Sequence, residues 1–315
     1  MRNESIEEST VGACSPISLA TDKRDFDPSH PDNSVSVIVP AYNAAKHIGE
    51  TLDSILKQTV PASEVIVVND GSTDGTAAIV RSFGQAVTLI ETPNQGVCKA
   101  RNLGAEKATS HWLAFCDSDD LWLPEKLEKQ LWLAHECPEI RCVITDYTTY
   151  TDGAVEARSH FSWAPQDFWG VEPRSSGFIV REPIAGRLTT FQPSITSVLL
   201  VKREFFNKTG GFDTYAQRWS SEDTCIHFRC LSVVPFGVIP EVLVLYRRHP
   251  EQWSADSLKQ LRNTVLVWEY MIAEYPEAKP WKNELEAGLT AMRKEIAEIR
   301  FYQWKQKIKR LIGMG

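Results

Sequence analysis

The sequence lacks the features that would place the protein across a membrane or outside the cell. No apolar run reaches the roughly 20 residues that a membrane-spanning helix needs, and the polar N-terminal stretch has no apolar core of the kind that marks a secretory signal peptide. Seven cysteines are present, but none forms a Cys-x-x-Cys pair or stands at zinc-ligand spacing from a histidine. Scattered cysteines in odd number are typical of reduced thiols. We therefore expect a cytoplasmic protein whose cysteines are small buried apolar side chains.

Positive charge is also scarce. Lysine and arginine total 34 against 41 aspartate and glutamate, so the formal net charge is −7. This balance argues against a general nucleic-acid binder, which usually presents a basic face. Small anionic substrates are still compatible, because a local field can oppose the net sign. The 315 residues suffice for one large domain or two small ones.

What the sequence does contain is an alternation of apolar strands and helices. Such alternation predicts an α/β fold with a mostly parallel sheet and helices on both faces. Ligands of such sheets bind beyond the carboxyl ends of the strands. The predicted strands cover residues 34–40, 64–70, 87–90 and 111–116, and the predicted helices cover 44–59, 97–108 and 124–136, the last with Pro124 at its first position.

Three carboxylates, Asp117, Asp119 and Asp120, directly follow the predicted strand 111–116. Mutual repulsion makes such a cluster unfavourable unless a positive group joins it. Polar segments also follow the strands 34–40 and 64–70, so the three strand ends should converge on one crevice.

Seven segments in this order and spacing resemble the family 2 glycosyltransferases, which have the GT-A fold. The resemblance covers about residues 34–254, and the full set is specific whereas each piece alone is weak. The segments read VSVIVPAYN, EVIVVNDGSTDGT, NQGVCKARNLGAEKA, FCDSDDLWLPEKL, GGFD, SED before a helix, and YRRHPEQWS.

The resemblance implies a GT-A type, Rossmann-like sheet and an inverting transfer of a sugar from a nucleotide-sugar, a UDP-sugar first, to an acceptor hydroxyl. It also implies Mn²⁺ or Mg²⁺ as cofactor, and an acceptor in polysaccharide, lipid-linked or small-molecule glycan synthesis. We expect a disordered tail over 1–33, a catalytic domain over 34–254 and a helical extension over 255–315. Within the domain, 34–121 would bind the nucleotide and 122–254 the acceptor.

The resemblance also assigns site residues. Asp223 would be the general base, with Glu222 as the other half of an acidic pair, and Arg247 and Arg248 would lie near the leaving diphosphate. Asp119 and His249 would bind the metal, and Asp120 would orient a ligand from behind them. The nucleotide would contact Pro40, Tyr42, Asn43, Asp70, Arg101, Asp117 and Ser118.

Each motif also has a structural interpretation. The aspartates could cap the helix near Pro124, although one cap needs one aspartate rather than three. Asn43 could cap the helix that follows it, and Asp70 could be a turn residue. Arg101 could be a solvated helix charge, and the acidic pair 222–223 could be an ordinary helix start. His249 could be a surface or packing residue, an interpretation as strong as the metal-binding one.

Three further segments carry weaker expectations. The aromatic residues of the irregular segment could stack on an acceptor sugar, although packing is the default for any aromatic. Gly210, Gly211 and Phe212 match a turn that lines the sugar pocket in the family. The aromatic residues are Trp163, Phe168, Trp169 and Phe191.

Near the C-terminus, Phe301, Trp304, Ile308 and Leu311 stand at helical spacing among lysines and arginines. A basic amphipathic helix can lie on an anionic membrane surface, which would place the enzyme at the inner face of the membrane. We favour the alternative, in which this face packs on its own domain.

Rival functions remain open. A nucleotidyltransferase also uses carboxylates and Mg²⁺ at a sheet end, but usually has a Gly-rich phosphate loop and a lysine that PAYNAAKH lacks. No G-x-G-x-x-G follows the first strand, which argues against a dinucleotide-dependent oxidoreductase. A non-catalytic nucleotide-sugar or carbohydrate-binding protein of the same fold is disfavoured by the intact acidic residues. The Q-x-x-R-W signature of processive synthases is absent, so we expect transfer of single sugars.

Overall fold

The computed structural model describes residues 26–151, 153–171, 177–249 and 257–311. Most of the predicted tail, residues 1–25, lies outside the described residues. Its last part is attached to the domain, because Phe26 packs edge-to-face against Trp132 with ring centroids 5.6 Å apart and residues Pro31–Asn33 form a 3-10 turn.

The first half of the sheet is parallel, as predicted. Its strand order is β3-β2-β1-β4, so each neighbour is reached by a crossover that includes a helix. Every residue of β1 is buried, as expected for a parallel strand covered on both faces. The elements are β1 (Val35–Ala41), α1 (Ile48–Leu56), β2 (Glu64–Asp70), α2 (Thr76–Ser82), β3 (Thr88–Thr92), α3 (Val97–Lys107) and β4 (Trp112–Phe115).

The second half of the sheet is mixed. Strand β9 (Leu200–Lys202) pairs antiparallel with both β4 and β6 (Cys142–Thr151), so β4 and β6 run in the same direction. Strand β10 (Phe236–Arg247) is parallel to β6. The carboxyl ends of β1, β2, β4, β6 and β10 therefore share one edge, and the α/β fold class is confirmed. The short strands β5 (Leu121–Trp122), β7 (Ala154–Val155) and β8 (Phe178–Val180) add antiparallel pairings that the sequence did not predict.

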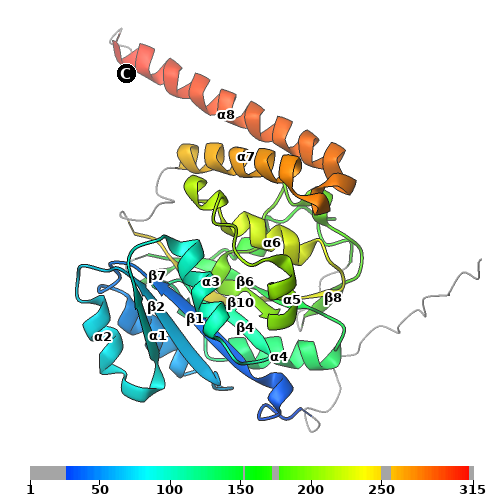
Figure 1. Ribbon diagram of the computed structural model, residues 1–315. Coiled ribbons are helices and arrows are strands. Elements are labelled where there is room, and N and C mark those ends of the chain that lie inside the picture. Colours follow the sequence, from blue (N-terminus) through cyan, green and yellow to red (C-terminus); the bar gives the residue numbers. More distant parts are fainter. Residues whose placement is uncertain (1–25, 152, 172–176, 250–256, 312–315) are drawn as a thin grey trace, which may run out of the picture.

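Helices pack closely on this sheet (Figure 1). Helix α3 lies on β1, where a Cβ at Gly104 would come within 2.4 Å of Ile38 Cγ2, so only glycine permits this approach. Helix α4 (Lys126–Glu136) starts two residues later than predicted, because Pro124 lies in the preceding turn and its carbonyl accepts a hydrogen bond from Thr59 N. Helices α5 (Arg203–Thr209) and α6 (Asp223–Leu231) complete the domain.

The C-terminal extension is helical, as predicted. It consists of two helices, α7 (Ser257–Glu274) and α8 (Lys282–Leu311), joined by a 3-10 segment over Pro276–Trp281. Trp268 of α7 is buried against Phe228 of α6. The first half of α8 also buries its apolar residues, but its second half diverges from α7 and projects from the body (Figure 1).

The expected packing of this second half on its own domain is wrong for the described side chains, because Phe301 and Trp304 are 55% and 57% exposed. The side chains of Ile308 and Leu311 lie outside the described residues. None of the described helices is long and apolar enough to cross a membrane.

Candidate functional site

An arginine joins the aspartates of the loop after β4 to the predicted acidic pair Glu222 and Asp223. Arg101 of α3 is 3% exposed and lies between two carboxylates from distant parts of the chain. Its Nη2 is 2.6 Å from Asp117 Oδ1, and its Nη1 is 2.9 Å from Glu222 Oε1. Burial alone would lower the pKa of Arg101, but Asp117 and Glu222 raise it above its ordinary value. The interpretation of Arg101 as a solvated helix charge is therefore wrong.

Asp223 stands in the first turn of α6, next to this bridge. Burial raises its pKa, the charge of Glu222 raises it further, and the pKa reaches about 7. Glu222 occupies the N-cap position of α6 without a capping hydrogen bond among the described residues, because its carboxylate faces Arg101. A carboxylate whose pKa lies near neutrality can take and release a proton at the pH of the cell.

Asp120 holds the acidic loop in place rather than facing the crevice. It is fully buried, its Oδ2 accepts a hydrogen bond from Ser197 Oγ at 2.5 Å, and its Oδ1 accepts one from Arg247 N at 3.0 Å. Burial and the charge of Asp119 raise its pKa well above its ordinary value. The helix-cap interpretation of the aspartates is wrong, because the N-cap residue of α4 is Glu125 and the side chain that accepts a hydrogen bond from its first turn is Gln58, whose Oε1 lies 3.0 Å from Leu127 N.

Asp119 and His249 form a second pair of contacting side chains in the site. His249 Nε2 lies 3.0 Å from Asp119 Oδ2, and the His249 ring centroid is 5.1 Å from that of His47. Burial and the charge of Asp117 raise the pKa of Asp119, while His249 lowers it. Arg247 Nε donates to the Asp119 carbonyl at 2.7 Å, so the end of β10 is tied to this loop. Arg248 beside it is exposed.

The side chains of Asp119 and His249 suit a divalent cation that takes the rest of its coordination shell from a bound ligand. Within the described ranges, no group of three or more histidine, cysteine, aspartate or glutamate side chains could hold a metal ion. Asp119 and His249 nevertheless offer an oxygen and a nitrogen side by side, with Asp117 adding negative charge that a cation would offset. Mg²⁺ and similar ions commonly take one or two carboxylates and complete their shell with phosphate oxygens and water.

Two residues predicted to contact the nucleotide, Asn43 after β1 and Asp70 at the end of β2, hold neighbouring loops in place. Asp70 is 4% exposed, and its two oxygens accept hydrogen bonds from the backbone nitrogens of Gln95 (2.9 Å) and Gly96 (2.7 Å). It also lines a cavity of about 280 Å³ beside α3. Asn43 Oδ1 accepts from Thr73 N at 2.8 Å, so the helix-cap interpretation of Asn43 is wrong.

The remaining predicted contacts differ in exposure. Tyr42 is 52% exposed beyond the end of β1, with its ring available to a ligand. Pro40 is buried within β1 and pairs with Val68 of β2. Ser118 is partly buried, and its carbonyl accepts a hydrogen bond from Thr51 Oγ1 at 3.0 Å.

Gln217 is a site residue that the sequence interpretation missed. Its Oε1 accepts a hydrogen bond from Cys98 N at the start of α3 at 2.9 Å. A Cβ at Gly96 would lie 1.7 Å from Gln217 Nε2, so the segment before the acidic pair fits directly against the loop that Asp70 holds. A glutamine in a polar loop carries no local sequence signal for this contact.

The aromatic residues of the irregular segment divide into two groups. Phe168 and Trp169 are buried and pack edge-to-face with centroids 4.9 Å apart, so they belong to the core. Phe191 packs against Phe168. Trp163 is 63% exposed, and the guanidinium of Arg158 lies 4.8 Å from its ring.

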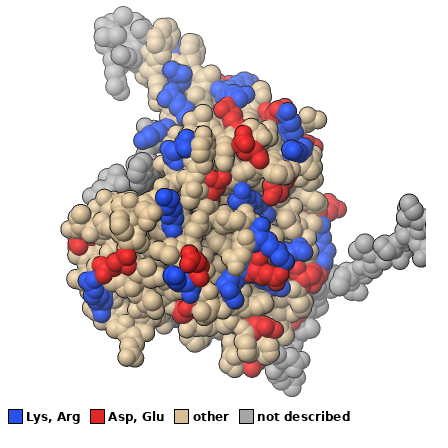
Figure 2. All heavy atoms as spheres, viewed as in Figure 1, with Lys and Arg blue, Asp and Glu red and all other residues tan. Residues whose placement is uncertain are grey.

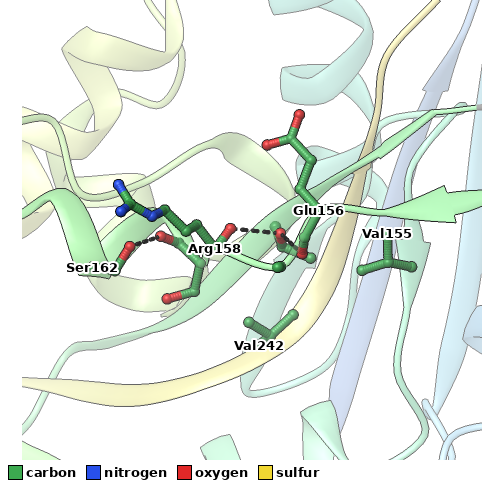
Figure 3. A pocket seen from close by; sticks show the side chains of 8 residues that line it. Val155, Glu156, Arg158, Ser162 and Val242 are labelled. Carbon is green, nitrogen blue, oxygen red and sulfur yellow. Dashed lines mark hydrogen bonds between the residues drawn. The ribbon is translucent and has the colours of Figure 1, made fainter.

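Arg158 also lines a cavity that has a volume of about 580 Å³ and lies beside the β6–β7 hairpin (Figure 3). Val155, Glu156 and Ser162 come from the hairpin and the turn that follows it, and Val242 comes from β10.

The turn with the two glycines supports the site from behind. A Cβ at Gly211, whose φ is +72°, would lie 2.6 Å from Asn102 Oδ1. Asn102 binds both backbone groups of Phe212, whose ring lies 5.0 Å from the Arg101 guanidinium. Gly210 ends α5 in the left-handed region. The turn therefore positions Arg101 through Phe212.

Comparison with known proteins places this architecture in one family. The family model for "Glycosyl transferase family 2" matches residues 36–193. The match includes the residues at the ends of β1, β2 and β4, and it ends before Glu222, Asp223 and His249. An uncharacterized glycosyltransferase of Rickettsia typhi is 30% identical over 237 residues, which are 74% of this chain and 70% of that protein.

Two solved structures share the fold. The TarS fragment 1–349 of S. aureus in complex with UDP-GlcNAc has a TM-score of 0.60 and 20% identity, and the likeness covers 82% of this chain and 72% of that one. The mannosyltransferase PcManGT of Pyrobaculum calidifontis, in complex with GDP-Man and Mn²⁺, has a TM-score of 0.54 and 22% identity, covering 89% and 83%.

Proposed function

The chain belongs to glycosyl transferase family 2, and from this premise we propose that it transfers single sugars from a nucleotide-sugar, a UDP-sugar first, to an acceptor hydroxyl with inversion. The acceptor belongs to polysaccharide, lipid-linked or small-molecule glycan synthesis in the cytoplasm. Contact of the C-terminal helix with a membrane is a separate proposal, which rests on the exposed end of α8 alone.

The observation that supports this proposal best is the Asp117–Arg101–Glu222 bridge. It joins the loop after β4 to the start of α6. Arg101 and Glu222 are 121 positions apart in the sequence. Asp223 therefore lies beside the donor-side carboxylates, although their motifs are far apart in the chain. In an in-line displacement the acceptor hydroxyl attacks the anomeric carbon opposite the leaving diphosphate, so its base must lie within reach of the donor site.

We assign Asp223 the role of base. In the transfer, its carboxylate takes the proton of the acceptor hydroxyl while that oxygen bonds to the anomeric carbon. The bond from the anomeric carbon to the diphosphate oxygen breaks, and a nucleoside diphosphate leaves. A pKa of about 7 suits this role, because the carboxylate is a stronger base than an ordinary aspartate and is still largely ionised above neutral pH.

Asp119 and His249 would hold the divalent cation. The cation, when bound, offsets the negative charge that develops on the leaving diphosphate. Arg247 keeps Asp119 in position through the 2.7 Å hydrogen bond to its carbonyl. The Mn²⁺ bound in the mannosyltransferase structure supports a divalent ion in this chain.

The nucleotide would lie between Tyr42 and Asp70. The exposed ring of Tyr42 offers a stacking face for a base. Asp70 uses its carboxylate to hold residues 95–96, and each carboxylate oxygen can accept further hydrogen bonds, including one from a uracil ring N–H. The UDP-GlcNAc and GDP-Man bound by the structural neighbours support a nucleotide-sugar donor.

The acceptor would approach from the side of residues 122–254. Phe168 and Trp169 are unsuitable for stacking on a sugar because they are buried. The cavity beside the β6–β7 hairpin, with Arg158, Ser162 and the exposed Trp163 near it, offers the polar groups and the aromatic face that glycan binding needs (Figure 3).

The test combines binding with donor hydrolysis, which requires no known acceptor. A thermal-shift screen of UDP-, dTDP- and GDP-sugars with and without Mn²⁺ should identify the donor, because a bound donor raises stability by mass action. The purified protein should then hydrolyse that donor slowly, and Asp223→Asn should lose hydrolysis while keeping the thermal shift. A protein that binds the donor but leaves it intact under all conditions would be a binding module, contrary to the proposal.

A further inference from the structure

The C-terminal half of α8 exposes an aromatic and basic surface, here called the α8 tip and defined as residues 300–305. Each of these six residues is exposed, with Phe301, Tyr302 and Trp304 at 55%, 63% and 57%. The Phe301 and Trp304 rings stack with centroids 5.9 Å apart, and Lys305 Nζ lies 4.5 Å from the Phe301 ring. Leu285 and Leu289 of the same helix are buried, so among the described residues of α8 the exposed large apolar side chains lie in its second half.

The part of the sequence after Glu298 has a positive net charge, opposite in sign to that of the whole chain. After Glu298 no acidic residue follows in the sequence, whereas the chain as a whole has a net charge of −7. Figure 2 shows lysine and arginine side chains beside the C-terminal end of the molecule. The basic residues of this stretch are Arg300, Lys305, Lys307, Lys309 and Arg310.

The direction of the α8 tip follows from the packing of the two C-terminal helices. Helix α8 returns along α7, and the ion pair between Arg293 and Glu269 (2.6 Å) fixes their alignment. The tip therefore extends toward the end of the helix pair at which α7 begins, at Ser257, and away from the body (Figure 1).

We propose that the α8 tip is a membrane contact that inserts Phe301 and Trp304 at the headgroup level of an anionic bilayer. Aromatic side chains of this kind concentrate at the membrane–water interface, and lysines and arginines around them are attracted by anionic headgroups. Pairing of two tips in a symmetric dimer is disfavoured, because two basic tips repel each other. The contact is independent of which sugar or nucleotide the enzyme uses.

The test is vesicle co-sedimentation of the full chain. Wild type should pellet with phosphatidylcholine:phosphatidylglycerol vesicles, should pellet much less with phosphatidylcholine alone, and should be released as salt is raised to about 0.5 M. The double substitution Phe301→Ser/Trp304→Ser should weaken binding to anionic vesicles by roughly tenfold or more. The matched control is Leu266→Ser on α7, which removes a 42% exposed apolar residue outside the α8 tip and should bind as wild type does.

Three outcomes would overturn the proposal. Equal pelleting of wild type and the double variant would show that the α8 tip is not the contact. Equal binding to neutral and anionic vesicles would remove the role of its charge. Absence of vesicle binding, with a wild-type dimer that the double variant converts to a monomer in light scattering, would make the surface a protein interface. Thermal unfolding of both variants checks that the fold is retained.

Discussion

Replacing Asp223 by asparagine should flatten the pH dependence of stability as well as abolish catalysis. The folded-state pKa of Asp223 is raised to about 7 by burial and by Glu222, whereas an aspartate in the unfolded chain titrates at about 4. The folded protein therefore holds this proton more tightly than the unfolded chain does. Its stabilising contribution is fully present below the unfolded pKa and is lost as the pH rises through the folded pKa.

The size of the effect follows from the two pKa values. Linkage gives about 2.5 kcal/mol of unfolding free energy lost by wild type between pH 5 and pH 8 through this one group. Asparagine has the same shape but no titratable proton, so the difference between variant and wild type should grow by that amount over the same interval. The assay is urea unfolding of both proteins at pH 5, 6, 7 and 8, followed by tryptophan fluorescence.

A matched control is Asp213→Asn. Burial raises the pKa of Asp213, but hydrogen bonds from Tyr275 and Tyr270 hold it below its ordinary value. Asp213 is therefore ionised in both states from pH 5 to pH 8, and its replacement should destabilise the protein by the same amount at every pH in that range. If the Asp223→Asn difference is also constant with pH, the raised pKa and the assignment of Asp223 as a base poised near neutrality are wrong.

Three further predictions concern Arg101, Lys126 and Gly96. Arg101→Lys keeps the positive charge but loses the planar guanidinium that spans Asp117 and Glu222. Hydrolysis of the nucleotide-sugar should fall by at least about tenfold, and the free energy of unfolding should fall by roughly 1–3 kcal/mol. Retained hydrolysis would show that the bridge has no part in the mechanism. Lys126 is fully buried, and burial lowers its pKa to about 7. Its cost to stability therefore grows as the pH falls from the unfolded-state pKa toward 7. Lys126→Met should stabilise the protein more at pH 6 than at pH 9, and urea midpoints without this pH trend would contradict the prediction. Gly96→Ala places a Cβ 1.7 Å from Gln217 Nε2 at a φ of +95°. It should therefore lower the thermal midpoint and weaken the stabilisation that a nucleotide gives. The control is Gly84→Ala, with a φ of +59° and open space around the new Cβ, which should leave the response to the nucleotide unchanged.

The local sequence determined the elements that bear the site. The β-branched runs of β1 and β2 and the apolar segment of β4 predict strands because they suit burial on both faces, and the polar residues after them mark the strand ends. The parallel order of the first four strands follows from the helices between them. The acidic loop 117–120 was identified because three carboxylates after a buried strand need more than a helix cap to explain them.

Contacts between distant segments were decided only by the tertiary structure. No local pattern joins Arg101 to Glu222 or Gln217 to Cys98, because side chains of any polar loop can reach many partners and only the fold selects one. The same holds for Asp120, whose burial under Ser197 makes it a support rather than a ligand.

Burial is likewise a property of the assembled chain. Residue type does not distinguish a buried phenylalanine from an exposed one: Phe168 is in the core, whereas Phe301 is 55% exposed on α8. Helical spacing of apolar residues predicts an apolar face on a helix. Which element packs against that face depends on the direction of the helix in the folded protein. The sequence thus determined which segments are strands, helices and charged loops, and the tertiary structure decided which side chains meet, because pairing depends on positions in space that no local pattern encodes.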